Sequence, residues 1–149
     1  SEHAFLSIND AGGASIVRSN GNPWTHLILR GAKSATGYQP NFDAASVADI
    51  EERLKAKSFT PQVMIDCSHA NSLYDHERQA VVVNDIIKQK TAGNESIFGL
   101  MLESYINPGK QKLTGPLSEL KYGVSVTDAC DGLGETEEIL THIYQNLRS

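Results

Sequence analysis

Three apolar runs, each followed by a loop and a helical pattern, constrain the fold of this chain more than any other feature. The runs are Thr25–Leu29, Gln62–Ile65 and Ile97–Leu102. The helical patterns are Val47–Leu54 with Asp43 as a candidate N-cap, Val82–Ile87, and Glu135–Leu147. Neighbouring parallel strands need long crossovers, and helical crossovers pack over the sheet. The order therefore predicts an α/β fold with parallel strands that are buried on both faces and helices outside.

The remaining segments predict smaller elements around this sheet. His3–Ile8 and Ala14–Arg18 flank a turn of Asn, Asp and Gly residues, which predicts a β-hairpin. Gly31–Asn41 and Asn107–Lys121 have the composition of loops, and Gly123–Thr127 is expected to form a short extended piece. No repeat or linker divides the chain, so we expect one unit.

Composition excludes several classes of protein. The chain has 149 residues, a formal charge of −5 and only two cysteines, and no apolar run approaches a membrane span. Its lysines and arginines form no cluster of the kind that binds nucleic acid. Glycine-rich nucleotide-binding motifs and the serine-hydrolase elbow are missing. We therefore expect a soluble, cytoplasmic protein that binds neither nucleic acid nor membranes.

Charged residues gather where the three apolar runs end. Arg30, Asp66, His69 and Glu103 each follow a predicted strand, and the carboxyl ends of parallel strands are where α/β proteins build their sites. His69, Glu103 and Asp128 together offer one imidazole and two carboxylates, a set that suits manganese, iron, cobalt or zinc. A hydrogen-bonded histidine with two solvated acids is the alternative that spacing alone leaves open.

Other residues near these positions can have either a functional or a structural role. Arg30, beside a glycine, can receive a phosphate or form a structural ion pair, and Lys33 can assist it or stay solvated. Asp66 is placed to orient a substrate hydroxyl or His69, or to brace the loop. Cys67 and Cys130 are expected to be small buried groups, although either thiol is close enough in sequence to reach a metal.

Four motifs, LILRGAK, QVMIDCSHANS, GLMLESYINPGKQ and LKYGVSVTDACDG, occur in this order along the chain. In these motifs the chain resembles the type I 3-deoxy-D-arabino-heptulosonate 7-phosphate (DAHP) synthases. Such enzymes condense phosphoenolpyruvate with erythrose 4-phosphate at the start of the shikimate pathway. The resemblance implies that His69, Glu103 and Asp128 bind the metal. It also implies that Arg30 binds the phosphoenolpyruvate phosphate, that Lys33 and Asp66 lie at the substrates, and that Arg30, Asp66 and His69 act in catalysis.

The resemblance covers the C-terminal half of the family's TIM barrel. It implies a β-hairpin extension at residues 1–20, followed at 21–149 by the last three strand–helix units. We therefore expect a fragment that lacks the N-terminal half of the barrel, self-associates as a homo-oligomer and has negligible activity alone. Ser7, Ile8 and Val17 fall on positions of the family's inhibitor pocket. The chain departs from the family's usual sequence at NDAGGAS and ACDGLGET, and Cys67 stands where the family usually has an aromatic residue.

Two other functions remain open at the level of sequence. One is a related phosphoenolpyruvate-condensing aldolase, 3-deoxy-manno-octulosonate 8-phosphate synthase, which shares the barrel but not the SHANS and TDAC motifs. The other is a non-catalytic, truncated module that binds metal or phosphate. Metal titration and a comparison of erythrose 4-phosphate with arabinose 5-phosphate as substrates separate these alternatives.

Overall fold

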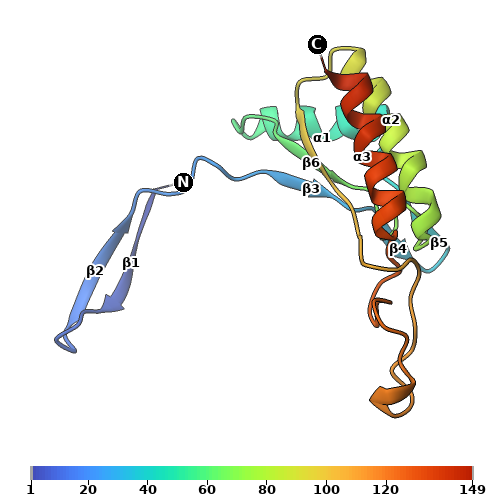
Figure 1. Cartoon of the computed structure of the whole chain (residues 1–149). Coiled ribbons are helices and arrows are strands. Elements are labelled where there is room, and N and C mark those ends of the chain that lie inside the picture. The colour runs from blue at the N-terminus through green and yellow to red at the C-terminus, as the bar shows by residue number, and fades with distance from the viewer. Residues whose placement is uncertain (1, 149) are drawn as a thin grey trace.

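A computed structural model describes residues 2–148. The first residue of the predicted unit 1–20 and the last residue of the predicted unit 21–149 therefore lie outside the description. Its centre is a parallel sheet in the order β3 (Leu27–Leu29), β6 (Val63–Asp66) and β7 (Ile97–Met101). Three helices follow these strands along the chain: α1 (Ala44–Ala56), α2 (Gln79–Thr91) and α3 (Leu133–Leu147) (Figure 1). The predicted parallel α/β arrangement is confirmed.

Helix starts follow from local hydrogen bonding. The Asp43 carboxylate accepts the backbone N–H groups of Ala45 and Ser46, as its position as N-cap of α1 predicts. Helix α3 begins at Leu133, two residues before the predicted start, because the N–H of Thr136 already donates to the carbonyl of Gly132. None of the helices within residues 2–148 is both long and apolar enough to cross a membrane.

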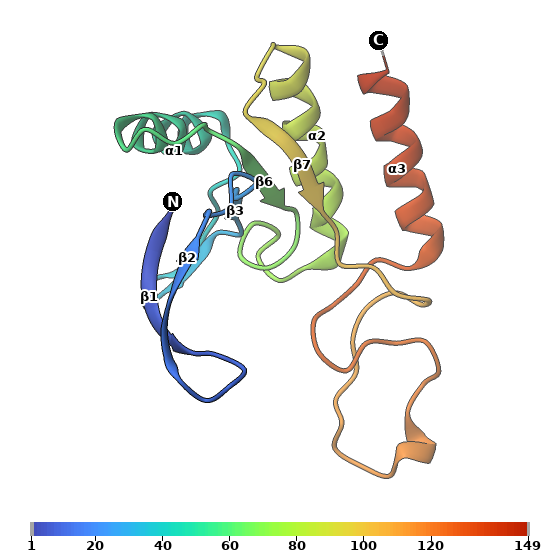
Figure 2. The same cartoon turned by 90° about the vertical axis from the view of Figure 1, so that its left-hand side faces the viewer.

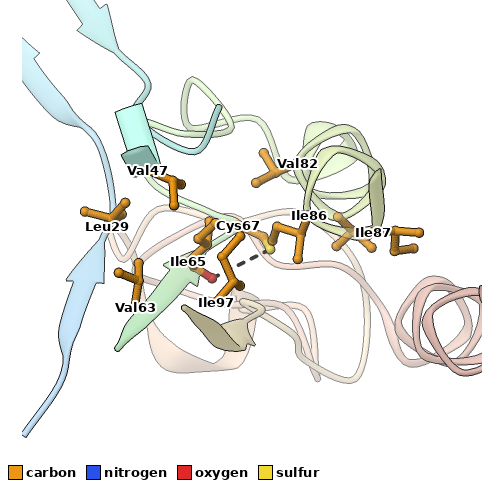
Figure 3. Packing of buried hydrophobic residues seen from close by; sticks show 10 residues of the cluster. Leu29, Val47, Val63, Ile65, Cys67, Val82, Ile86, Ile87 and Ile97 are labelled. Atoms are coloured by element: carbon orange, nitrogen blue, oxygen red, sulfur yellow. Dashed lines mark hydrogen bonds between the residues drawn. The ribbon is translucent and has the colours of Figure 1, made fainter. Parts of the chain in front are cut away.

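The hydrophobic core lies between one face of the sheet and the helices, and Figure 3 shows its packing. Val63 and Ile65 point from β6 toward Val47 of α1 and toward α2, and all three side chains are fully buried. The other buried members of the cluster are Leu29, Cys67, Val82, Val83, Ile86, Ile87 and Ile97. Alternation along a strand sends every second side chain to this face.

The prediction that the strands are buried on both faces is wrong. Ile28 of β3 is 42% exposed and Phe98 of β7 is 50% exposed. The helices lie on the other face, and the register of β6 and β7 shifts between Val63 and Met64, which leaves Phe98 without a cross-strand partner. This second surface of the sheet, marked by Ile28 and Phe98, is called the open sheet face below.

The predicted N-terminal hairpin is confirmed. Strands β1 (His3–Ile8) and β2 (Ala14–Ser19) pair antiparallel, and the Asn9 side chain accepts the backbone N–H groups of Ala11 and Gly13 in the turn. Figure 1 shows the hairpin standing apart from the sheet and helices, and in Figure 2, turned by 90°, it lies toward the viewer. Its residues therefore contribute little to the core.

One predicted loop and one predicted extended piece differ in the structure. The segment Gly31–Asn41 contains a small antiparallel hairpin of β4 (Ala32–Ser34) and β5 (Gly37–Gln39). Gly123–Thr127 is not a strand, and only an isolated bridge joins its Ser125 to Lys110. Single turns of 3-10 helix occur at His76–Arg78 and Leu117–Glu119.

Candidate metal centre

The predicted metal ligands, with Asp66 and Arg30, lie at the edge of the sheet where the parallel strands end. Strand β6 ends at Asp66, and the chain turns so that His69 adopts a left-handed conformation with φ of 50°. The carbonyl of His69 accepts the N–H of Tyr74 at 2.7 Å and the hydroxyl of Ser72 at 3.2 Å. These bonds hold the histidine backbone in a conformation that non-glycine residues rarely adopt.

His69, Glu103 and Asp128 come together at this edge, with one ligand atom from each lying within 4.8 Å of the others. The Nε2 atom of His69 lies 3.8 Å from Glu103 Oε1 and 3.7 Å from Asp128 Oδ2. The His69 side chain is 12% exposed, whereas those of Glu103 and Asp128 are 33% and 42% exposed. Three side chains far apart in sequence thus face one point that is open to solvent on one side.

The donor set fits a divalent cation. Both distances from Nε2 exceed a hydrogen bond, so the carboxylates converge on the ring without bonding to it. Ligands bound at about 2.1 Å would lie roughly 3.0–3.4 Å apart at octahedral to tetrahedral angles. The two separations from Nε2 are a few tenths of an ångström wider, whereas the three ligand atoms together span up to 4.8 Å, so the side chains have to rotate inward to hold one ion. One imidazole with two carboxylates suits a metal of intermediate hardness.

Asp66 lies behind the histidine. Its carboxylate is 2% exposed, and Oδ2 lies 2.8 Å from His69 Nδ1, although this approach is not aligned for a hydrogen bond. Its Oδ1 accepts the N–H of Ser68 at 2.9 Å. A carboxylate beside Nδ1 favours the tautomer that leaves the Nε2 lone pair free for a ligand role. The aligned bond to Ser68 matches the predicted loop-bracing role, and the position of Oδ2 beside Nδ1 supports the role of orienting His69, which stays a prediction.

Arg30 follows β3 at the same edge. Its side chain is 57% exposed, and Nε lies 4.0 Å from Asp66 Oδ2, a long and solvent-screened pairing that leaves the guanidinium free to bind an anion. Gly31 next to it has φ of 69°, and a Cβ there would lie 2.9 Å from both Ala70 Cβ and the Gln39 carbonyl oxygen. Only glycine fits this close approach between the two strand ends.

Asn71 joins the ends of β3 and β6. Its amide donates to the carbonyls of Leu29 at 3.0 Å and Asp66 at 2.8 Å, and its oxygen accepts the N–H of Asn41 at 2.8 Å. The residue is 1% exposed. Asn71 lies within the QVMIDCSHANS motif, but the sequence predicts no role for it, because an amide that binds distant backbone leaves no local pattern.

Lys33 is not in contact with the three converging side chains. It lies in β4, not in a loop, and its Nζ lies 5.8 Å from the centre of the Tyr38 ring. Tyr38 packs on Tyr74 with ring centres 4.9 Å apart, and Tyr74 meets the His69 ring edge-on at 6.0 Å. A series of rings thus connects the lysine to the site, and its substrate role stays a prediction.

The two cysteines differ in their relation to the site. Burial raises the pKa of the Cys67 thiol to about 12, and its Sγ lies among the core residues, pointing to the carbonyl of Ile65. Cys130 Sγ lies 3.4 Å from the Asp128 carbonyl oxygen and 4.0 Å from Glu103 Oε2. Burial also raises the pKa of the Cys130 thiol. Both thiols are buried as predicted, and Cys130 alone lies beside the converging carboxylates.

The three residues expected in an inhibitor pocket do not share a surface within the described chain. Ser7 and Val17 point to one side of the β1–β2 hairpin, and Ile8 points to the other, because adjacent strand residues alternate. Ile8 is 75% exposed and Val17 is 39% exposed. A pocket that uses all three needs a further surface against the hairpin, so their role stays a prediction.

Known proteins confirm the resemblance carried by the motifs. The family model described as the DAHP synthetase I family matches residues 1–141. The chain belongs to this family. Among DAHP synthetase relatives, the Tyr-sensitive phospho-2-dehydro-3-deoxyheptonate aldolase of Escherichia coli is 44% identical over 145 residues, covering 97% of this chain and 39% of that protein. A putative phospho-2-dehydro-3-deoxyheptonate aldolase of Schizosaccharomyces pombe is 45% identical over 148 residues, covering 99% and 39%.

The fold agrees with a solved member of the DAHP synthetase family. The structure of phospho-2-dehydro-3-deoxyheptonate aldolase from Francisella tularensis superposes with a TM-score of 0.81 at 39% sequence identity. The match covers 99% of this chain and 41% of that protein. The chain thus spans about two fifths of the length of the relatives named here.

Proposed function

We propose that this chain supplies the metal-binding edge and part of the phosphate-binding surface of a DAHP synthase. The reaction is the condensation of phosphoenolpyruvate with erythrose 4-phosphate, with release of phosphate. One observation carries the proposal: His69, Glu103 and Asp128 converge within 4.8 Å at the ends of parallel strands. Arg30 lies beside them, 4.0 Å from the Asp66 carboxylate that backs His69. Family membership supports the same assignment.

Each residue has a distinct role in this proposal. His69, Glu103 and Asp128 hold a divalent ion, which is manganese, iron, cobalt or zinc. When bound, the ion supplies Lewis-acid polarisation of a substrate carbonyl. Arg30, together with Lys33, binds substrate phosphate through charge-assisted hydrogen bonds. Asp66 orients His69 and lies where it can contact the sugar phosphate.

We further propose that residues 21–149 are the C-terminal portion of a TIM barrel and that residues 1–20 form a β-hairpin extension. The exposed apolar side chains of the open sheet face support this proposal, because the inner face of a barrel strand packs against neighbouring strands. The rest of the substrate site then comes from an N-terminal half like that of the full-length relatives. We expect a cytoplasmic homo-oligomer that has negligible activity without that half.

Calorimetric titration of the protein with Mn²⁺ tests the metal site. We expect one ion to bind, and His69→Ala to abolish the binding heat. His142→Ala is the matched control, because His142 is exposed and its hydrogen bonds within residues 2–148 go to Asn84 and Asn146 on the helices, away from the site. Equal Mn²⁺ binding by the unmutated protein and His69→Ala would contradict the assignment.

Complementation tests the reaction. The chain is produced together with the N-terminal part of the Escherichia coli relative that it does not match, and phosphate release from phosphoenolpyruvate is measured. We expect turnover with erythrose 4-phosphate, little with arabinose 5-phosphate, and loss of turnover in Arg30→Ala. Turnover by the chain alone would contradict the need for the second half. Metal binding without turnover in the mixture would favour the non-catalytic module.

Light scattering tests the proposed self-association. The strands β3 and β7 are the two edges of the sheet, and the open sheet face is apolar. Unpaired edges and apolar surface favour pairing with another copy. We expect a mass at least twice that of one chain, and a monomer over the micromolar range would contradict the prediction.

A further inference from the structure

Gln79, the first residue of α2, is fully buried and bonds to the backbone of one candidate metal ligand. Its Oε1 accepts the N–H of Glu103 at 2.9 Å, and its Nε2 donates to the carbonyl of Glu103 at 2.9 Å. One amide side chain thus satisfies both backbone groups of Glu103. The Glu103 side chain is left free to point toward His69.

Glu103 needs such a partner because of its place in the sheet. Strand β7 ends at Met101, so the backbone of Glu103 lies beyond the ladder with β6. Backbone groups outside a ladder have to find other hydrogen-bond partners when they are shielded from water. The two bonds from Gln79 fix the position from which the Glu103 carboxylate reaches the site.

The same amide also holds the segment that carries Asp128. Gln79 Nε2 donates to Asp131 Oδ2 at 2.9 Å, and the N–H of Asp131 donates to the Glu103 carbonyl at 2.9 Å. Asp131 is 3% exposed and lies three residues after Asp128. The three residues Gln79, Glu103 and Asp131 therefore form a closed hydrogen-bonded unit between the two segments that bear the carboxylate ligands.

We propose that Gln79 is a positioning residue that sets the spacing of the Glu103 and Asp128 carboxylates and thereby the affinity and geometry of the cation site. It acts through Glu103 and Asp131 and does not itself face the ion. This inference rests on the proposed function, since it assumes that the converging side chains bind a divalent cation. Removing a residue that hydrogen-bonds to a metal ligand commonly lowers the metal affinity by about 10- to 100-fold.

A cobalt titration of the protein tests the proposal, because Co²⁺ absorption in the visible range reports ligand geometry. Gln79→Met keeps the length and burial of the side chain but removes all three bonds. We expect Co²⁺ affinity to fall about 10- to 100-fold and the visible spectrum to shift. A role that is only structural would lower the melting temperature without metal and leave the spectrum of the loaded protein unchanged.

Gln89→Met is the matched control. Gln89 is also a buried glutamine of α2, but its amide donates to the Phe42 carbonyl and to Asp85, away from the converging side chains. We expect this variant to lose thermal stability while it keeps the Co²⁺ affinity and spectrum of the unmutated protein. An equal loss of affinity in both variants would overturn the proposal, because any buried amide of α2 would then have the same effect.

A charge-swapped pair keeps the test valid if Gln79→Met does not fold. Gln79→Glu places a third acceptor against the Glu103 carbonyl and Asp131 Oδ2, so it should weaken Co²⁺ binding. Adding Asp131→Asn supplies a donor to the introduced carboxylate and should restore part of the affinity. Absence of rescue, or an unchanged spectrum in Gln79→Glu, would overturn the positioning role. Absence of Co²⁺ binding by the unmutated protein would instead overturn the proposed metal site, and this inference with it.

Discussion

Asp66→Asn is the substitution that tests most directly how the candidate metal centre is built. The carboxylate has three partners: Ser68 N–H at 2.9 Å, His69 Nδ1 at 2.8 Å and Arg30 Nε at 4.0 Å. Asparagine keeps the side-chain volume and the bond from Ser68. It removes the negative charge that favours a proton on Nδ1 and a free lone pair on Nε2 of His69.

The size of the effect follows from the burial of these contacts. The Arg30 side chain is 57% exposed and 4.0 Å away, so its contribution is below about 1 kcal/mol. The Asp66 and His69 side chains are 3% and 12% exposed, so water cannot replace the lost carboxylate. Loss of a partner behind a ligand costs about 10- to 100-fold in metal affinity, which is about 1.4–2.7 kcal/mol. We expect Asp66→Asn to lie in the upper half of this range.

Calorimetry with Mn²⁺ measures the effect, and thermal unfolding without metal checks that the variant folds. Asp85→Asn is the control: Asp85 accepts a hydrogen bond from Gln89 on α2 and does not contact the site. An affinity within twofold of the unmutated protein would refute the argument that Asp66 orients His69. A similar loss in Asp85→Asn would show that the effect is a general one on folding.

Four further outcomes follow from single residues. Gly31→Ala should lower the free energy of unfolding by about 2–4 kcal/mol in urea titrations, because the left-handed backbone and two contacts at 2.9 Å both resist a Cβ; a loss below 1 kcal/mol would contradict this. Asp43→Ala should cost about 1 kcal/mol near neutral pH. Since hydrogen bonds to Ser46 lower the pKa of Asp43 in the folded state, that contribution should start to fall below the carboxyl's ordinary pKa of 3.8 and be lost as the pH falls through the lowered pKa. Burial raises the pKa of Asp131 to about 6, so the folded state binds more protons than the unfolded one between pH 4 and 6. Unfolding free energy without metal should therefore fall by about 1–2 kcal/mol as pH rises through this window, and Asp131→Asn should flatten the curve. The Cys67 thiol, whose pKa burial raises to about 12, should resist iodoacetamide at pH 8 until urea unfolds the chain, as mass mapping of the labelled peptide would show.

The sequence predicted those parts of the structure that depend on local pattern. Apolar runs and helical spacing identified the three strands of the sheet and the helices that follow them, and Asp43 was correctly expected to cap α1. His69 and Glu103 were expected at one edge because parallel strands end together, and Asp128 was expected after a short extended piece. The structure brings all three together, although the segment before Asp128 is not a strand. For these elements the local sequence pattern and the topology of the sheet predict the same structure.

The parts that sequence missed depend on tertiary context. The strands β4 and β5 have three residues each and lack a continuous apolar alternation, so a loop was expected. Burial of both sheet faces was inferred from the apolar character of the strands, although Ile28 is exposed. Asn71 and Gln79 bond to backbone groups that are distant in sequence, and no spacing rule marks such residues.

The open sheet face affects how the folding of this chain can be monitored. Ile28 and Phe98 expose apolar surface while the opposite side of the same strands is packed against helices. Dyes such as ANS fluoresce on apolar surface and are commonly used to detect loosely packed states. Where neither another copy nor further barrel strands cover this face, the dye would bind the ordered sheet, so bright fluorescence would report a native surface and near-ultraviolet circular dichroism would be the sounder signal of lost packing.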